Sequence, residues 1–280
     1  MNFLISFFYG LVEGITEWLP ISSTGHLIIF EDLFPFDKKD LNDSFIDMFR
    51  VVVQLGAILA VVFLYWKKFF PFDFSKNRKS IIQPHIMSLW FKIFVSCVPA
   101  AIIGILFDDK IDALFYNSLT VSISLAVFGV LFIIIEKINE NKQFKIDSPY
   151  DITYKAALII GIFQLIAAIF PGTSRSGATI IGALLIGISR TAATEYTFFL
   201  GIPVMFGASL LKIFKFVTEE NVMSSTEWGV LAIGFIVSLI VSIVAIKFLV
   251  GYVKKHNFIF FGWYRIVLAI VVITYSLLSN

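Results

Sequence analysis

Glu13 and Glu17 stand four residues apart near the amino terminus, inside an apolar stretch. On a helix this spacing puts both side chains on one face, close together. Two carboxylates so placed repel each other, and each is costly to remove from water. A divalent cation relieves both problems, and carboxylate oxygens suit Mg²⁺ or Ca²⁺. The pair predicts a metal site, with protonated or interfacial glutamates as the alternative.

Hydroxyl groups and one imidazole follow in the segment Ser22-Ser23-Thr24-Gly25-His26. Hydroxyls and free amides at the start of a helix can cradle phosphate oxygens. A serine hydroxyl becomes nucleophilic only beside a base, and His26 and Glu17 are the bases within reach. The alternative is a serine-rich helix cap with a histidine hydrogen-bonded to it. His85 and His256 lie in basic loops and receive no role.

Arg175 is the strongest single feature, because it lies among small hydroxyl residues in the segment Pro171-Gly172-Thr173-Ser174-Arg175-Ser176-Gly177. Inside an apolar region an arginine needs an anion, and a guanidinium fits phosphate by paired hydrogen bonds. An ion pair with Glu17 is the alternative, and it would place both residues at one site. Arg265, in a later apolar run, is expected to snorkel or to pack.

The composition says which environment holds these groups. Of the 280 residues 58% are hydrophobic and 15% charged, and the apolar residues form long runs, as in chains that lie in lipid. A net charge of +2 gives no reason to expect nucleic acid as a partner. The single cysteine, Cys97, excludes a disulfide framework and reads as a packing residue. The first residues lack the basic start of a cleavable signal peptide.

Six segments are long and apolar enough to cross a bilayer, at 49–66, 90–107, 117–136, 195–216, 228–249 and 259–278. Basic residues concentrate in cytoplasmic loops. Three connections are basic and are therefore expected on the cytoplasmic side. The first contains Lys67, Lys68, Lys76, Arg78 and Lys79, the second Lys137, Lys142, Lys145 and Lys155, and the third Lys254 and Lys255. Two are acidic and are expected outside, at 108–112 and at Glu219, Glu220 and Glu227.

Two further regions, 1–32 and 156–190, each consist of two apolar pieces around a polar centre with glycine and proline. Broken backbone at membrane depth is tolerated only where protein or a wet cavity meets it. Both regions are therefore predicted to be re-entrant hairpins that enter and leave by the same face.

The two hairpins also resemble each other, which predicts an internal repeat. Gly10 aligns with Gly161, Pro20 with Pro171, Ser22-Ser23 with Thr173-Ser174 and, after one inserted residue, Gly25 with Gly177. Three crossings follow each hairpin, so the second copy starts from the opposite face. We expect an all-α polytopic membrane protein with one domain, 1–280. Its pseudo-repeats, about 1–140 and about 150–280, have inverted topology and meet at a midplane site.

The segments 13–26 (EGITEWLPISSTGH) and 171–177 (PGTSRSG) resemble the two signatures of the bacterial undecaprenyl-pyrophosphate phosphatase family linked to bacitracin resistance. Shorter matches at 53–56, 98–100, 106–109 and 264–266 extend the resemblance over essentially the whole chain.

The resemblance implies hydrolysis of undecaprenyl pyrophosphate, which recycles the lipid carrier for cell-wall synthesis, in the bacterial plasma membrane with the site open outward. It implies a divalent cation, Mg²⁺ or Ca²⁺, held by Glu13 and Glu17. It also implies a catalytic group that consists of Glu17, Ser23, His26 and Arg175. The residues that it places near the phosphates are Ser22, Thr24, Thr173, Ser174 and Ser176.

The sequence leaves the nucleophile open between Ser23, His26 and water. Pairing with a second copy as a homodimer is also left open. The rival function is a polyprenyl-phosphate flippase, since inverted repeats around broken hairpins also occur in transporters. Transport, however, does not require a nucleophile beside a base.

Overall fold

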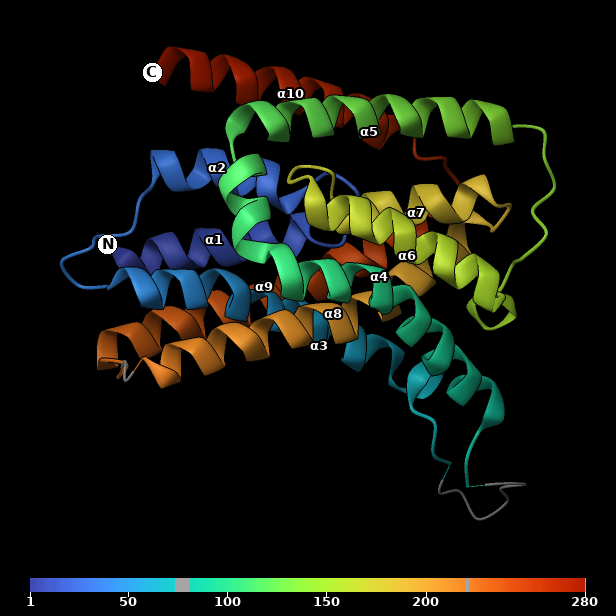
Figure 1. Ribbon diagram of the computed structural model, residues 1–280, viewed down its shortest axis with the longest axis horizontal. Helices are drawn as coiled ribbons and strands as arrows, with labels where there is room; N and C mark the ends of the chain where they lie inside the picture. Colours follow the sequence, from blue (N-terminus) through green and yellow to red (C-terminus); the bar gives the residue numbers. More distant parts are fainter. Residues whose placement is uncertain (74–80, 220–221, 280) are drawn as a thin grey trace.

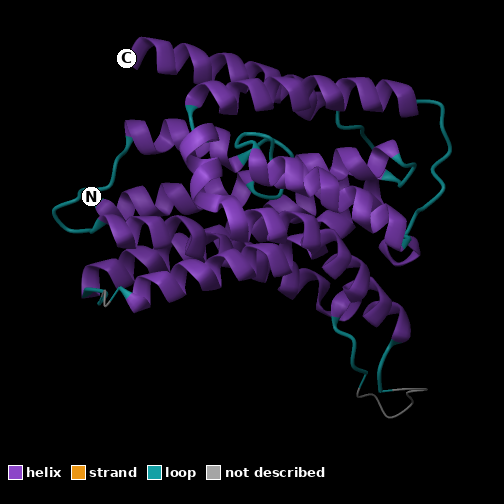
Figure 2. Ribbon diagram, viewed as in Figure 1, coloured by secondary structure: helices purple, strands orange, loops and turns teal. Residues whose placement is uncertain are grey.

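Every regular element of the protein is a helix within the residues that the computed structural model describes, which are 1–73, 81–219 and 222–279 without the side chains at 108, 109 and 112. No β-strand occurs in these ranges (Figure 2). The predicted all-α class is confirmed. The loop cations Lys76, Arg78 and Lys79 and the acidic Glu220 lie outside the described residues.

Six long helices are apolar enough to cross a membrane, as predicted. They are α3 (Asp43–Phe69), α4 (Pro84–Phe115), α5 (Ser118–Asn139), α8 (Arg190–Thr218), α9 (Ser225–Val253) and α10 (Ile259–Ser279). Each overlaps one predicted segment, so length and apolar composition were sufficient to find them.

Helix α4 departs from the prediction at its carboxyl end. The acidic segment 108–112 was expected to be a loop, but the helix continues through it to Phe115. No glycine or proline interrupts residues 105–115, and Lys110, Ala113 and Leu114 favour helix. Three aspartates alone did not end the helix, so the connection to α5 is shorter than expected.

Four shorter helices form the two predicted hairpins. The first hairpin pairs α1 (Asn2–Thr16) with α2 (Ser23–Leu33), and the second pairs α6 (Tyr154–Ile169) with α7 (Arg175–Leu185) after a short 3₁₀-helix, Pro149–Asp151. None is long enough to cross a bilayer alone. The hairpins extend from opposite ends of the molecule, and their turns lie near its middle (Figure 1).

Both turns end on a serine with unusual backbone geometry. Ser22 has φ 74° and Ser174 has φ 67°, a left-handed region that side chains other than glycine seldom adopt. Each serine Oγ accepts a hydrogen bond from a glycine amide three residues later, Gly25 at 3.3 Å and Gly177 at 3.2 Å. The caps pair Ser22 with Ser174, whereas the sequence alignment paired Ser23 with Ser174. The extra residue of the second turn therefore lies before Ser174 and not after it.

The long helices hold the hairpins in place. Helix α5 packs along α10, and α9 packs against both α1 and α3. The crossing of α5 and α10 depends on glycine, because a Cβ added at Gly129 or at Gly262 would lie 2.8 Å from the other residue's carbonyl oxygen. This close approach brings α10 against the turns of both hairpins.

Candidate active site

Glu17 joins the two hairpins. It follows the last residue of α1, and its Oε1 accepts a hydrogen bond from Nη2 of Arg175 at 2.9 Å. Its Oε2 accepts one from Oγ of Ser23 at 3.0 Å. The ion pair is mostly buried, with 13% of the arginine side chain and 10% of the glutamate side chain exposed. Ser23 of the first hairpin and Arg175 of the second thus share the Glu17 carboxylate.

Arg175 is held on several sides in addition to Glu17. It is the first residue of α7, and it donates from Nη1 to the Thr197 carbonyl of α8 at 3.1 Å. The guanidinium lies over the Trp18 ring, 5.4 Å from its centroid. Helix α8 makes room for it at Gly201, where an added Cβ would lie 2.7 Å from Nη1. The arginine is therefore fixed before any anion binds.

His26 faces a different partner from the one expected. Its Nδ1 lies 2.7 Å from the Ser22 carbonyl oxygen, and its Nε2 lies 2.7 Å from the Tyr264 hydroxyl of α10. A carbonyl only accepts, so Nδ1 carries a proton, and a neutral ring accepts at Nε2 from Tyr264. The Tyr264 ring also stacks on the imidazole. Of the two predicted bases, it is Glu17 that contacts the Ser23 hydroxyl.

Glu13 is fully buried, and neither of its carboxylate oxygens has a hydrogen-bond partner. An ionised carboxylate left so is strongly unfavourable, and a cation or a proton would compensate it. The orphaned oxygens fit the predicted metal site. Within the described part of the chain, however, no three His, Cys, Asp or Glu side chains gather around one point. Further ligands would therefore be substrate oxygens and water, as is usual for Mg²⁺.

The residues predicted near the phosphates divide into two groups. Ser174 and Thr24 are half-buried and line the turns. Ser22, Thr173 and Ser176 are buried, and the Ser176 hydroxyl bonds the Glu17 carbonyl at 3.2 Å, which ties the second hairpin to the first. Contact of any of these five with substrate stays a prediction.

Arg265 is the residue that sequence reasoning misjudged. It was expected to snorkel or pack, but its side chain is fully buried beneath both turns. It donates hydrogen bonds to three backbone carbonyls, those of Pro20, Gly172 and Thr173. The available signal was an arginine inside an apolar span, which is functional by default.

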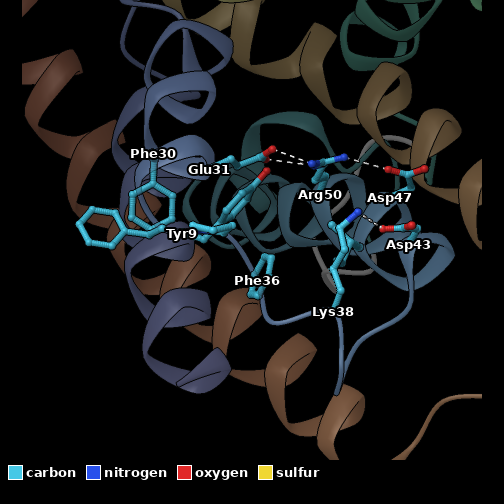
Figure 3. Close-up of a pocket in the computed structure, with 11 residues that line it drawn as sticks. Tyr9, Phe30, Glu31, Phe36, Lys38, Asp43, Asp47 and Arg50 are labelled. Carbon is cyan, nitrogen blue, oxygen red and sulfur yellow. Dashed lines mark hydrogen bonds and ion pairs between the residues drawn. The ribbon is translucent and has the colours of Figure 1, made fainter. Parts of the chain in front are cut away.

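A pocket of about 280 Å³ lies at the mouth of the first hairpin, away from this constellation (Figure 3). Tyr9 and Phe30 line it, and Arg50 of α3 there bonds Glu31 of α2 and Asp47. The Arg50–Glu31 contact fastens α2 to α3. None of the residues predicted for catalysis, substrate or metal lines this pocket.

Comparison with known proteins agrees with the geometry. Residues 6–271 match the model of a family described as bacitracin resistance protein BacA. The chain belongs to the BacA family. A protein of Clostridium acetobutylicum named undecaprenyl-diphosphatase 1 is 58% identical over 99% of this chain and 98% of its own. The undecaprenyl-diphosphatase of Enterococcus faecalis is 58% identical over 96% of both chains. That of Desulfitobacterium hafniense is 56% identical over 95% of this chain and 93% of its own. The BacA match begins within α1, ends within α10 and includes every helix between them.

Proposed function

We propose that the protein is an undecaprenyl-diphosphatase, which hydrolyses undecaprenyl diphosphate to undecaprenyl phosphate and inorganic phosphate. The reaction recycles the lipid carrier for cell-wall synthesis. Its relatives at 58% identity carry that name. The observation that carries the proposal is the Glu17 carboxylate, which contacts both a serine hydroxyl and an arginine. A pure transporter would not need that arrangement.

Ser23 is the nucleophile that the contacts favour. Its Oγ forms a bond to the terminal phosphorus, while the bond from that phosphorus to the bridging oxygen breaks and releases undecaprenyl phosphate. Glu17 takes the serine proton, because its Oε2 lies 3.0 Å from the hydroxyl oxygen. Water then attacks the phosphoserine and releases inorganic phosphate. Arg175 compensates the phosphate charge, which is the main form of catalysis in phosphoryl transfer.

A divalent cation, Mg²⁺ or Ca²⁺, is the proposed cofactor. Glu13 and Glu17 would hold it, and the support is the buried Glu13 carboxylate without a partner. A bound cation supplies positive charge beside the diphosphate oxygens. Glu13 would bind it through oxygens that have no other described hydrogen-bond partner, whereas Glu17 has one oxygen toward Ser23 and one toward Arg175.

The proposed setting is the bacterial plasma membrane, with the pseudo-repeats about 1–140 and about 150–280 inverted relative to each other. Three facts support the inversion: each repeat has two short helices followed by three long ones, the turns share a serine cap, and the hairpins extend from opposite ends (Figure 1). The alternating loop charges support placing the first hairpin on the outer side, and the family resemblance supports a site open to that face. Pairing into a homodimer stays a prediction.

Phosphate release from a prenyl diphosphate by the purified protein tests the function and its cofactor together. We expect release with Mg²⁺ or Ca²⁺, loss with EDTA, and recovery when the cation is added back. Glu13→Gln should raise the cation concentration that gives half-maximal rate by tenfold or more, by analogy with the loss of one charged ligand. Glu227→Gln, a change of a buried carboxylate that caps the start of α9, is the matched control. No release by the folded protein under either cation would refute the phosphatase.

A further inference from the structure

Arg265 is a buried cation whose hydrogen bonds, among the described residues, all go to backbone carbonyls. Its guanidinium donates from Nη1 to the Pro20 carbonyl at 3.3 Å, and from Nη2 to the carbonyls of Gly172 at 3.0 Å and Thr173 at 2.7 Å. One side chain of α10 thus fastens the turn of the first hairpin to the turn of the second. These turns are 152 positions apart for their matched serines, Ser22 and Ser174 (174 minus 22), so no local contact could align them.

The surroundings are built to receive this arginine. An added Cβ at Gly177 of α7 would lie 3.1 Å from its Nη1, and one at Gly129 of α5 would lie 3.2 Å from its Cβ. Gly172 has φ 88°, which helps turn two successive carbonyls toward one nitrogen. A side chain at Gly172 would also lie 2.5 Å from the Val121 carbonyl oxygen. Gly177 and Gly129 therefore make space for Arg265, and Gly172 lets the second turn pack closely against α5.

The charge of Arg265 is not balanced by an acid. In the described part of the chain no carboxylate lies within ion-pair distance of it, whereas Arg175 is paired with Glu17. Burying a charge without a counter-charge is strongly unfavourable. The carbonyl dipoles solvate the guanidinium, but they do not neutralise its positive charge. A fully buried positive charge beside two phosphate-binding turns points to a bound anion as its complement.

The Thr173 contact also sets the direction of an amide. In a trans peptide unit the C=O and the N–H point in opposite directions. Because the Thr173 carbonyl is drawn toward Arg265, the Ser174 N–H points away from it. That amide donates to no group among the described residues, and Ser174 is half-buried at the start of α7. A free amide next to a helix start is a typical donor to phosphate.

We propose that Arg265 is the positioning residue of the diphosphate site: it locks the turns of both hairpins from behind, directs the Ser174 amide toward the substrate and adds an unpaired buried charge. The proposal rests on the phosphatase function. It assigns two separable roles to one side chain. The charge strengthens binding of the diphosphate, and the planar fork sets the geometry on which the rate of the chemical step depends.

Two substitutions separate these roles. Arg265→Lys keeps the charge but cannot reproduce the fork, so we expect affinity within about threefold of wild type and kcat lower by about 10–100-fold. Arg265→Met removes charge and fork, so affinity should fall by about tenfold or more, with kcat lower still. Affinity is measured as the Kd of a prenyl methylenediphosphonate, which cannot be hydrolysed at the bridging position, and kcat as phosphate release.

Controls distinguish positioning from general destabilisation. Arg190→Lys alters a half-buried arginine that pairs with Glu136, and should change thermal stability without changing kcat or Kd. Arg265→Lys combined with Arg175→Lys should lose less than the product of the single losses, because both act on one phosphate site. If either variant unfolds, the other still gives a Kd and a kcat.

Wild-type kcat in Arg265→Lys, or wild-type Kd in folded Arg265→Met, would overturn the proposal. Multiplicative losses in the double variant would also overturn it. Absence of phosphate release by the wild type would instead refute the phosphatase itself, and the Kd measurements would still test the anion site.

Discussion

The turns of the two hairpins share a backbone but present different side chains. Both end on a serine with positive φ whose Oγ accepts from a glycine amide three residues later. The next residue begins a helix of 11 residues in each hairpin, but it is Ser23 in the first and Arg175 in the second. The same position thus supplies a hydroxyl group in the first hairpin and a guanidinium in the second.

This difference shows how two turns with the same backbone cap can make an asymmetric site. The shared cap leaves the first amides of α2 and α7 free, which suits an anion at either turn. Glu17 and Glu13 belong only to the first hairpin, and their counterparts in the second are apolar or neutral, such as Gln164. The acid, the hydroxyl and the guanidinium meet because the turns face each other.

The largest effect is expected from the residue that links the two turns. Glu17→Gln leaves a group that cannot take the Ser23 proton and cannot pair with the Arg175 charge, so kcat/KM should fall by about 10³-fold or more. Phosphate release under saturating Mg²⁺ measures it. Glu227→Gln should stay within about threefold of wild type, since Glu227 contacts only the start of α9 among its described hydrogen bonds. If Glu17→Gln kept a tenth of wild-type activity, the contacts of Glu17 with Ser23 and Arg175 would not be essential for catalysis.

A smaller effect should follow from displacing the Arg175 guanidinium of the second turn. In Gly201→Ala the new Cβ would lie 2.7 Å from Nη1 and 2.9 Å from Nη2 of Arg175, so the guanidinium must shift. A misplacement near 1 Å can lower the rate by about 10²-fold. Gly207→Ala on the same helix is the matched control, because nothing lies within 4 Å of its added Cβ. Equal kcat/KM for the two variants would show that the placement of Arg175 is not critical.

The smallest effect tests whether the caps are equivalent. Ser22→Ala and Ser174→Ala each remove a cap hydrogen bond and should each lower the free energy of unfolding by about 1 kcal/mol. Replacement by glycine, which suits positive φ, should lower it by only a few tenths. Thermal unfolding in detergent compares the four variants. If alanine is harmless at one turn and damaging at the other, the shared backbone does not reflect a shared role.

Much of this arrangement could be predicted from local features. The long helices follow from apolar length, and the breaks at both turns follow from glycine, proline and hydroxyl residues. Glu17, Ser23 and Arg175 were predicted to share a site, and hydrogen bonds join the three side chains; their catalytic roles stay predictions. An arginine in an apolar hairpin needs an anionic partner, so its charge alone predicts that such a group lies beside it.

Other features depend on contacts between distant segments and could not be read locally. Arg265 stands among apolar residues of α10 as a snorkelling arginine would, and only its carbonyl partners, as much as 245 positions away, reveal its place. His26 was one of two bases predicted for Ser23, with Glu17, but its second nitrogen contacts Tyr264, 238 positions later. The helical end of α4 was missed for a different reason, because clustered aspartates were taken as a loop signal.

The proposed reaction depends most on Ser23 as the nucleophile that Glu17 activates. Acid quenching of the enzyme during turnover of a prenyl diphosphate, followed by mass spectrometry of its peptides, tests this directly. We predict one phosphoryl group on Ser23 in wild type, and none in Glu17→Gln or Ser23→Ala. Turnover by Ser23→Ala at the wild-type rate, with no phosphorylated peptide in wild type, would contradict it and assign the attack to water or His26.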